Sequence, residues 1–399
     1  MGACHCRCAD NDVAVHPERE QMSLVPEKVA DTLLDEYGFR VPNVVPITLA
    51  RLTDQSIVDA QLALQWREIA ISEKTADHWR VSNLAAVQRL LAKGIPCECR
   101  STIWLLASGA SSLRASSPRS YASYFNAHQD ESVIRQIEVD VPRTYSEHRF
   151  FTGPGRGQLT RLLNALADRL GKDVRYVQGM NIVAGLVLLV CDDEEVAFWI
   201  VVAFMEQLNM KPLYVDGLDQ LQACLRTLGQ LISSKLPDVR RYFGEEGIEP
   251  FCYGTPWFLT MFAYALPVRQ CARLFDVAFI MHQGQEWVYR FAIAYVQSVA
   301  PAIVKMPFTS ATALLKTINV DDDELERLIL TALRLEWDDH RAADDGFAKV
   351  AGAATGDFDK VESEPGYDIT SNDDAKKYNA LRPSAGSTAN VITPGTVID

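Results

Sequence analysis

Stripes of apolar residues at helical spacing recur along this chain, and they constrain its fold more than any other feature. The segment 158–171 (QLTRLLNALADRLG) carries leucines at the i, i+3, i+4, i+7 and i+11 positions of one helix face: Leu159, Leu162, Leu163, Leu166 and Leu170. Gly171 follows directly and favours the end of a helix. The segment therefore predicts an amphipathic helix packed on a core.

The same pattern recurs in 82–94, 218–232 and 325–333, and residues 56–71 are also helix-like. In the segment 82–94, Ser82 is a candidate N-cap, and Gly94 suits the position just after the helix end. Credible strands are far fewer than these helical stripes. We therefore predict an all-α fold.

Composition limits the class of protein further. The chain has 399 residues, of which 48% are hydrophobic and 23% charged, which is enough for a large core or two lobes. A net charge of -13 argues against broad binding to nucleic acid or anionic lipid. The longest apolar run, Ile182–Cys191, is too short to span a bilayer. Nine irregularly spaced cysteines and no secretory segment predict an intracellular, cytoplasmic protein.

The helical pattern does not extend over the whole chain. Residues 1–80 are mixed in character and interrupted by Pro42 and Pro46, so we expect a partly disordered N-terminal extension. Residues 81–337 hold the clear helical stripes and form the expected domain. Residues 338–399 are rich in Asp, Gly, Ala, Ser and Thr without periodicity, which predicts a disordered acidic tail.

The first residues, MGACHCRC, allow three readings. Gly2 followed by Cys4 and Cys6 resembles a myristoylated and palmitoylated N-terminus, which would hold the protein peripherally on endomembranes. A metal site with His5 is a rival, although the thiols are too close together for an ordinary zinc loop. A plain disordered end is the third reading.

Several common catalytic signatures are missing. Gly153, Gly155 and Gly157 suggest a nucleotide loop, but no G-K-[ST] follows and no strand precedes them, so a flexible turn is the better interpretation. The sequence has no H-E-x-x-H and no G-x-S-x-G. The chain therefore lacks the parts of an ordinary nucleotide hydrolase, metalloprotease or serine hydrolase.

Three polar clusters remain, and the last of them raises a question. In RYVQGMN, Tyr176, Gln178 and Asn181 stand at the start of a long apolar segment. A buried amide without a partner costs a few kcal/mol, so these side chains need one.

The two earlier clusters each contain an arginine. Arg100 lies four residues before Trp104, one helical turn away, where its guanidinium can stack on the indole or reach a carboxylate. The second cluster, IEVDVPR, contains Ile137, Asp140 and Arg143. Its alternation could pass for a strand, but the proline at position 142 argues against that and places the arginine on a turn or a helix start.

In this order and spacing, the clusters resemble the TBC domain of Rab GTPase-activating proteins. That family is marked by the motifs R-x-x-x-W, I-x-x-D-x-x-R and Y-x-Q, and all three are intact here. The resemblance covers about residues 90–335 and includes a later block, 255–284. In that block Phe275 stands where the family has tryptophan, which we interpret as a packing substitution.

The resemblance implies a two-lobed helical domain with a groove that receives a Rab-family GTPase in its GTP form. Arg143 is then the arginine finger and Gln178 the glutamine finger, both supplied in trans to accelerate GTP hydrolysis in vesicle trafficking. Asp140 would orient the arginine by a charge-assisted hydrogen bond. Tyr176 would support the glutamine or touch the GTPase.

The remaining motif residues would have supporting roles. Arg100 and Trp104 would pack behind the finger segment, and Ile137 and Asn181 would complete their motifs. The protein would need no cofactor of its own, because it acts on the GTP and Mg²⁺ held by its partner. It would be a GTPase activator and not itself a nucleotide hydrolase.

Two alternatives belong to other classes. The first is a scaffold that binds a small GTPase without accelerating hydrolysis, a pseudo-GAP, against which the intact Arg143 and Gln178 argue. The second is an α-helical solenoid, for which the sequence shows no repeats of 30–45 residues.

Overall fold

The apolar segment after Gln178 forms a buried helix, α10 (Met180–Val190), around which the neighbouring helices pack. Every residue from Met180 to Leu188 is buried, which explains why the segment is apolar on all sides and not only on one stripe. The computed structural model describes residues 35–39, 49–72, 84–126, 130–172, 174, 176–191 and 193–335.

The described residues fall within one unit, Met1–Glu336. The helices of its first part are α2 (Leu49–Ser72), α4 (Leu84–Leu91), α5 (Cys97–Ala107), α6 (Ala110–Ser116), α7 (Tyr121–Phe125), α8 (Glu131–Asp140), the 3-10 helix η1 (Val141–Arg143), α9 (Gly155–Leu170), α10 and α11 (Glu194–Glu206). Its second part contains η2 (Lys211–Tyr214), α12 (Asp219–Lys235), α13 (Pro237–Glu246), η3 (Pro250–Cys252), α14 (Gly254–Thr260), α15 (Val268–Met281), α16 (Gln285–Ile303), α17 (Phe308–Lys316) and α18 (Asp322–Arg334).

The prediction of an all-α fold is confirmed. Among the described residues there is no strand, and an isolated bridge joins Val174 to Val215. The five leucines predicted to form one face of α9 are all buried. In α12 the predicted stripe is buried from Leu221 to Ile232, while Leu218 lies before the helix with a positive φ of 56°.

One local expectation needs correction. We interpreted the glycine-rich stretch around Gly155 as a flexible turn, but α9 begins at Gly155 itself. A Cβ at this glycine would lie 2.5 Å from the ring of Phe150, so the residue is needed for a close approach between the helix start and the preceding turn. The glycine therefore allows this close packing.

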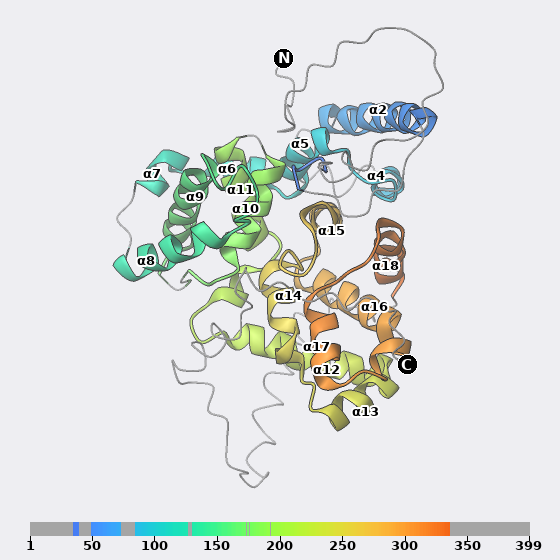
Figure 1. Cartoon of the computed structure of the whole chain (residues 1–399). Coiled ribbons are helices and arrows are strands. Elements are labelled where there is room, and N and C mark those ends of the chain that lie inside the picture. The colour runs from blue at the N-terminus through green and yellow to red at the C-terminus, as the bar shows by residue number, and fades with distance from the viewer. Residues whose placement is uncertain are drawn as a thin grey trace, which may run out of the picture. The chain divides into compact units, whose positions relative to one another are not determined.

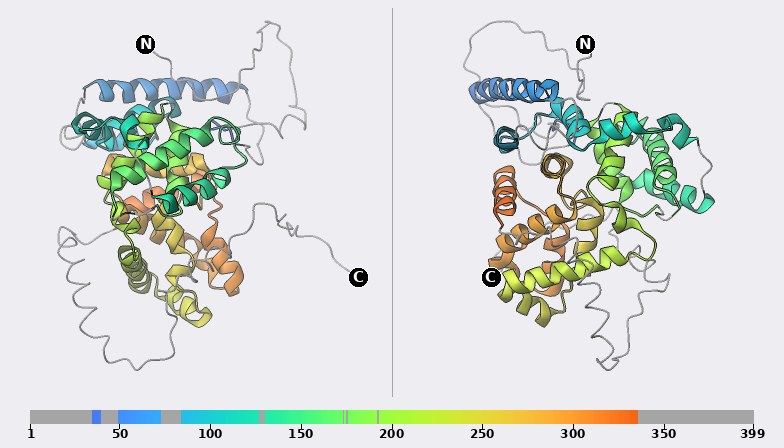
Figure 2. Two further views of the ribbon diagram at one scale, coloured as in Figure 1. Left: turned by 90° about the vertical axis from the view of Figure 1, so that its left-hand side faces the viewer. Right: turned by 180° about the vertical axis from the view of Figure 1, so that it is seen from behind.

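The helices gather into the two lobes that the family resemblance implied (Figure 1). In the first, α9, α10 and α11 pack on one another, and α7 and α8 cover α9. In the second, α12 packs on α13 and α14, and α16 packs on α17 and α18. Helix α15 lies between the groups, because it contacts α5 and α10 as well as α18 (Figure 2).

Two segments of the predicted N-terminal extension pack against this domain. Helix α2 lies along α5 and α4, and the Nε1–H of its fully buried Trp66 donates to the Gly94 carbonyl at 2.9 Å. The second segment, Asp35–Phe39, is a tight turn in which Tyr37 is buried. Both segments are therefore part of the folded unit.

Some expectations lie outside the described residues. They include the candidate N-cap Ser82, the lipidation candidates Gly2, Cys4 and Cys6, and the tail after residue 337. Among the residues that were described, no helix has the length and apolar character needed to cross a membrane.

Candidate functional site

Arg143 projects from the end of a helix whose supporting residues are buried. Helix α8 ends at Asp140, and η1 continues the chain through Pro142, whose missing N–H interrupts the helical hydrogen-bond ladder. Val141 and Thr144, on either side, are buried, whereas 38% of the Arg143 side chain is exposed. The arginine thus reaches solvent from a fixed base, as the last residue of η1, whereas the sequence indicated a turn or a helix start.

The buried Asp140 carboxylate binds the Arg143 guanidinium. The Arg143 Nη2 donates to Asp140 Oδ1, and the hydroxyl of Tyr176 donates to Oδ2 at 2.8 Å. Asp140 is only 3% exposed, although a carboxylate at a helix C-terminus is unfavourable for the helix dipole. The charge-assisted hydrogen bonds from Arg143 and Tyr176 offset this unfavourable interaction with the helix dipole, and they restrain the arginine.

Gln178 lies beside the same guanidinium. The Arg143 Nη2 donates to Gln178 Oε1 at 3.1 Å, which joins two side chains 35 positions apart in the sequence. Gln178 is half-buried, and the next residue, Gly179, has φ of 119° just before α10 begins. The positive φ favours glycine here, and a Cβ at Gly179 would also make a tight contact of 3.2 Å with Thr260 Cγ2.

The side-chain amide of buried Asn181 forms the hydrogen bonds at the start of α10. Its Oδ1 accepts from the Gly179 N–H at 2.9 Å, and its Nδ2 donates to Thr144 Oγ1 at 2.7 Å. Thr144 Oγ1 in turn donates to the Asp140 carbonyl at 2.8 Å. Fully buried Asn181 therefore ties the backbone beside Gln178 to the backbone beside Arg143.

The residue after Thr144 is also held by α10. Tyr145 has a positive φ of 44°, which is strained for a non-glycine residue, and its hydroxyl donates to the Ile182 carbonyl at 3.2 Å. Burial raises the pKa of Tyr145 well above its usual range, so the hydroxyl keeps its proton. A Cβ at Gly185 would lie 2.9 Å from the Tyr145 ring, so the missing side chain at this glycine leaves room for that ring.

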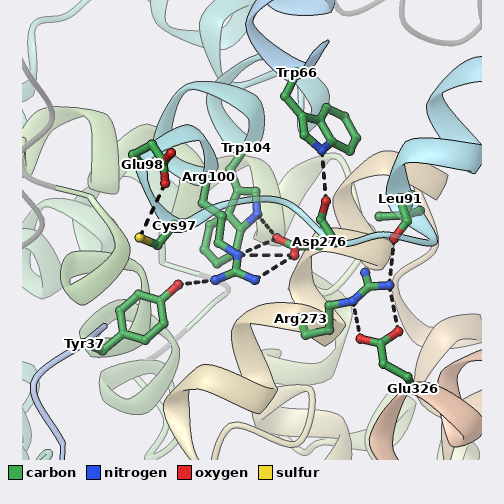
Figure 3. Close-up of polar contacts among 11 residues, drawn as sticks. Tyr37, Trp66, Leu91, Cys97, Glu98, Arg100, Trp104, Arg273, Asp276 and Glu326 are labelled. Atoms are coloured by element: carbon green, nitrogen blue, oxygen red, sulfur yellow. Dashed lines mark hydrogen bonds and ion pairs between the residues drawn. The ribbon is translucent and has the colours of Figure 1, made fainter. Parts of the chain in front are cut away.

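Arg100 and Trp104 form a separate buried cluster on Asp276 (Figure 3). Arg100 Nε donates to Asp276 Oδ1 at 3.1 Å and its Nη2 to Oδ2 at 3.2 Å, while Trp104 Nε1 donates to Oδ1 at 2.8 Å. Arg100 Nη1 donates to the hydroxyl of Tyr37. Of the two contacts expected for Arg100, the one to a carboxylate is present.

The charge states within this cluster follow from burial and pairing. Burial alone would lower the pKa of Arg100, but the Asp276 carboxylate and Tyr37 outweigh it and raise the pKa above its usual range. Burial raises the pKa of Tyr37, so that its hydroxyl stays neutral and accepts from the guanidinium. The pair is therefore an internal ion pair that links α5 to α15.

The structure thus separates the motif residues into two places. It brings together Arg143, Gln178, Asp140, Tyr176 and Asn181, while Ile137 is fully buried on α8. Within the part of the chain that is described, no hydrogen bond joins Arg100 or Trp104 directly to residues 137–143. Both were expected to pack behind the finger segment; the hydrogen bonds of Arg100 go to Asp276 and Tyr37, and that of Trp104 goes to Asp276.

Sequence reasoning missed three supporting residues. Thr144 carries no signal beyond its place after the motif arginine, and Gly185 is a single glycine inside an apolar helix, which can mark a close approach. Tyr37 lies in the mixed N-terminal stretch. Among the described residues, no group of three Cys, His, Asp or Glu side chains is arranged to hold a metal ion.

These features define a helical domain that presents an arginine and a glutamine on a buried support. The sequence model of the Rab-GTPase-TBC domain family matches residues 97–304. The chain belongs to this family.

Relatives and solved structures agree. The chain is 33% identical over 214 residues to the ecotropic viral integration site 5 ortholog of Drosophila melanogaster, covering 52% of this chain and 25% of that protein. It is 27% identical over 268 residues to growth hormone-regulated TBC protein 1-A of Danio rerio, covering 66% of this chain and 73% of that one. It thus spans only a quarter of the length of the Drosophila relative.

The crystal structure of the Chlamydomonas flagellar RabGAP TBC domain is similar in fold. The TM-score is 0.58 at 25% identity, and the match covers 75% of this chain and 99% of that chain. This structural match covers more of the chain than the family model does, because the family model matches residues 97–304, about half of the chain.

Proposed function

We propose that this protein accelerates GTP hydrolysis on a Rab-family small GTPase by supplying Arg143 and Gln178 to the GTPase's active site. The observation that carries the proposal is their arrangement: the two side chains hydrogen-bond each other at 3.1 Å, and Arg143 reaches solvent from a base of buried residues. Membership of the family and the RabGAP name of the Chlamydomonas domain support a Rab as the partner.

The arginine suits the charge that develops during hydrolysis. Negative charge in phosphoryl transfer spreads over the γ-phosphoryl and leaving oxygens, and a guanidinium supplied in trans is worth about 10³–10⁵ in rate. Arg143 is always charged and presents its donors in a planar fork. Asp140 holds one of them, so the guanidinium enters the GTPase already oriented.

The glutamine suits the attacking water. A carboxamide both accepts from and donates to a water molecule, so one group can orient it for attack. Gln178 Oε1 accepts from Arg143 in the free protein, which places the amide next to the guanidinium. Two groups that act on the same phosphoryl must lie this close, because they serve the same reacting centre.

Exposed apolar residues near the pair support a docking surface. Val139, one residue before Asp140, is 62% exposed. Tyr264 is 44% exposed, and its N–H donates to the hydroxyl of Thr260, whose methyl group lies against Gly179. Apolar side chains around a reactive centre are what a protein partner would cover.

The test is single-turnover hydrolysis by a panel of purified Rab GTPases loaded with GTP, with the full chain and its Arg143→Ala and Gln178→Ala variants. Arg135→Ala and Gln136→Ala are matched controls, because they remove the same side-chain types from exposed positions on α8. We expect acceleration of one or a few Rabs, lost by about 10³-fold or more in Arg143→Ala and retained in both controls.

Two outcomes would contradict the proposal. If no Rab is accelerated but one binds in its GTP form, the protein is a pseudo-GAP and Arg143 only contacts its partner. If Arg135→Ala lowers the rate as much as Arg143→Ala, the loss reflects weaker docking and not the chemistry of a finger.

A further inference from the structure

The turn Asp35–Phe39 is organised by its own hydrogen bonds. Asp35 Oδ1 accepts from the N–H groups of Tyr37 at 3.0 Å and Phe39 at 2.9 Å. The Asp35 N–H donates to the Phe39 carbonyl at 2.8 Å, and the Gly38 N–H donates to the Asp35 carbonyl at 2.9 Å. This closed five-residue unit lies outside residues 97–304, which the family model matches.

On one side this turn contacts the buried ion pair. The Tyr37 hydroxyl accepts from Arg100 Nη1, while the same guanidinium binds Asp276 on α15 (Figure 3). Tyr37 is 7% exposed and Arg100 is also 7% exposed, so the contact is shielded from water. Hydrogen bonds to a charged group in such surroundings are stronger than exposed ones.

On its other side the turn contacts the chain that follows Arg143. The Tyr37 carbonyl lies 2.6 Å from His148 Nε2, and His148 Nδ1 accepts from the Phe150 N–H at 3.3 Å. Because a carbonyl only accepts, Nε2 carries the proton and the imidazole is neutral. His148 is 6% exposed, and hydrogen bonds at both ring nitrogens hold its side chain in place.

Phe39 and Gly38 complete the contact. The Phe39 ring lies 4.6 Å from the His148 ring and packs at 6.0 Å, edge on, against Tyr145. Gly38 has φ of 84°, and a Cβ there would lie 2.9 Å from His148 Nε2. Phe39 thus touches the strained residue that stands two positions after Arg143.

We propose that the turn Asp35–Phe39 is a positioning element for the arginine finger, which braces the strained segment after Arg143 against the buried Arg100–Asp276 pair. The inference rests on the proposed function of Arg143. The R-x-x-x-W motif then acts on the finger through Tyr37 and His148 and not by direct contact.

The expected effect is on the rate at saturation and not on binding. The Tyr145 backbone is strained and keeps its conformation only while its surroundings hold it. Without the Phe39 and His148 contacts the Arg143 base can relax, and a displacement near 1 Å costs about 10²-fold in rate. The docking face is not altered, so the GTPase concentration for half-maximal rate should stay the same.

The first comparison is between Gly38→Ala and Gly247→Ala in the full chain, with the Rab that responds most strongly in the panel. Both glycines have positive φ, 84° and 68°, but a Cβ at Gly247 has nothing within 4 Å. Gly38→Ala should lower the saturating single-turnover rate about 10–100-fold, and Gly247→Ala should leave it unchanged. Equal rates in both variants would overturn the proposal.

The second comparison separates positioning from folding. Phe39→Ala is combined with Arg143→Ala, and the melting temperature of each variant is recorded. If Phe39 acts through Arg143, Phe39→Ala lowers the rate in the wild-type background and has no further effect once the arginine is gone. Equal losses in both backgrounds would mean a general structural role and would overturn the inference.

Failure of this inference differs from failure of the proposed function. If the unaltered chain accelerates no Rab, the finger itself is wrong. If the unaltered chain is active and Arg143→Ala is not, while both Gly38→Ala and Phe39→Ala keep the full rate, only the positioning element is wrong.

Discussion

Two arginine–aspartate pairs of the same composition serve opposite purposes in this molecule. In the pair Arg143–Asp140 the arginine side chain is 38% exposed, whereas in Arg100–Asp276 it is 8% exposed. Both carboxylates are buried, at 4% and 0%. The pairs therefore differ mainly in whether the guanidinium can leave its carboxylate and meet another group.

The difference teaches which arginine is structural. In the Arg143–Asp140 pair the carboxylate is buried but the guanidinium is 38% exposed, so it can still donate to a further group while the Tyr176 hydroxyl helps to satisfy the carboxylate. A buried pair is different, since removing one partner leaves an uncompensated charge and costs about 3–5 kcal/mol. The Arg100 guanidinium is also fully engaged by Asp276 and Tyr37.

The largest expected effect concerns the exposed pair. Under the proposed function, Arg143→Ala should reduce the stimulated GTP hydrolysis by the Rab about 10³–10⁵-fold, equivalent to roughly 4–7 kcal/mol of barrier. The variant's free energy of unfolding should fall less than that of Arg100→Met, by about 1–2 kcal/mol, because the Tyr176 hydroxyl still donates to the buried Asp140 carboxylate. Single-turnover kinetics measure the rate, and urea denaturation of the same preparation measures the free energy of unfolding. A loss of stability as large as that of Arg100→Met would mean that the two ion pairs do not differ in their structural role.

The next effect concerns the buried pair. Arg100→Met should lower the free energy of unfolding by about 3–5 kcal/mol, because the fully buried Asp276 carboxyl loses its ion-pair partner. Replacing both residues, as Arg100→Met with Asp276→Leu, should recover part of that loss. Urea denaturation checks both variants. If the double variant is no more stable than the single one, the unpaired charge is not the cause.

A smaller effect is expected at the support of the exposed pair. Tyr176→Phe removes the hydroxyl that donates to Asp140 Oδ2 at 2.8 Å and should slow saturated hydrolysis about 10-fold, near 1.4 kcal/mol. Tyr124→Phe is the matched control, because Tyr124 is also buried and its hydroxyl bonds Ser117, in the segment before α7. A Tyr176→Phe variant with the full rate would show that Asp140 orients Arg143 without the Tyr176 hydroxyl.

The smallest effects compare two glycines inside helices. A Cβ at Gly185 in α10 would lie 2.9 Å from the Tyr145 ring, while one at Gly244 in α13 has nothing within 4 Å. Gly185→Ala should slow hydrolysis a few-fold, and Gly244→Ala should stabilise the fold by about 0.5–1 kcal/mol without changing the rate. Thermal denaturation measures the stability of each variant, and single-turnover kinetics measure its rate. A lower rate in Gly244→Ala would contradict the explanation that the contact with Tyr145 causes the effect of Gly185→Ala.

Much of the fold could be predicted from the sequence because its signals are local. The leucine spacing in 158–171 and the apolar run after Gln178 both report helices within one stretch of chain, and both are buried as expected. The grouping of Arg143 with Gln178 was different, since the two are 35 positions apart and only the resemblance to the family joined them.

The Arg100 cluster could not be predicted, for a physical reason. Its partners Asp276 and Tyr37 stand 176 and 63 positions away, and no local pattern marks either as the partner of an arginine. The choice between an indole and a carboxylate for Arg100 depends on which helix packs over α5. That packing is a property of the folded chain, and it made Trp104 a second donor to the same carboxylate.

The link through Asn181 has one more consequence. Because this side chain bonds both the backbone next to Gln178 and the hydroxyl of Thr144, a movement of α10 carries the segments of Gln178 and Arg143 together. Their mutual spacing is therefore preserved while the exposed surface around them changes, as at Val139 and Tyr264. Under the proposed function, substitutions at these exposed positions would change the choice of partner while the spacing of the Arg143 and Gln178 side chains stays the same.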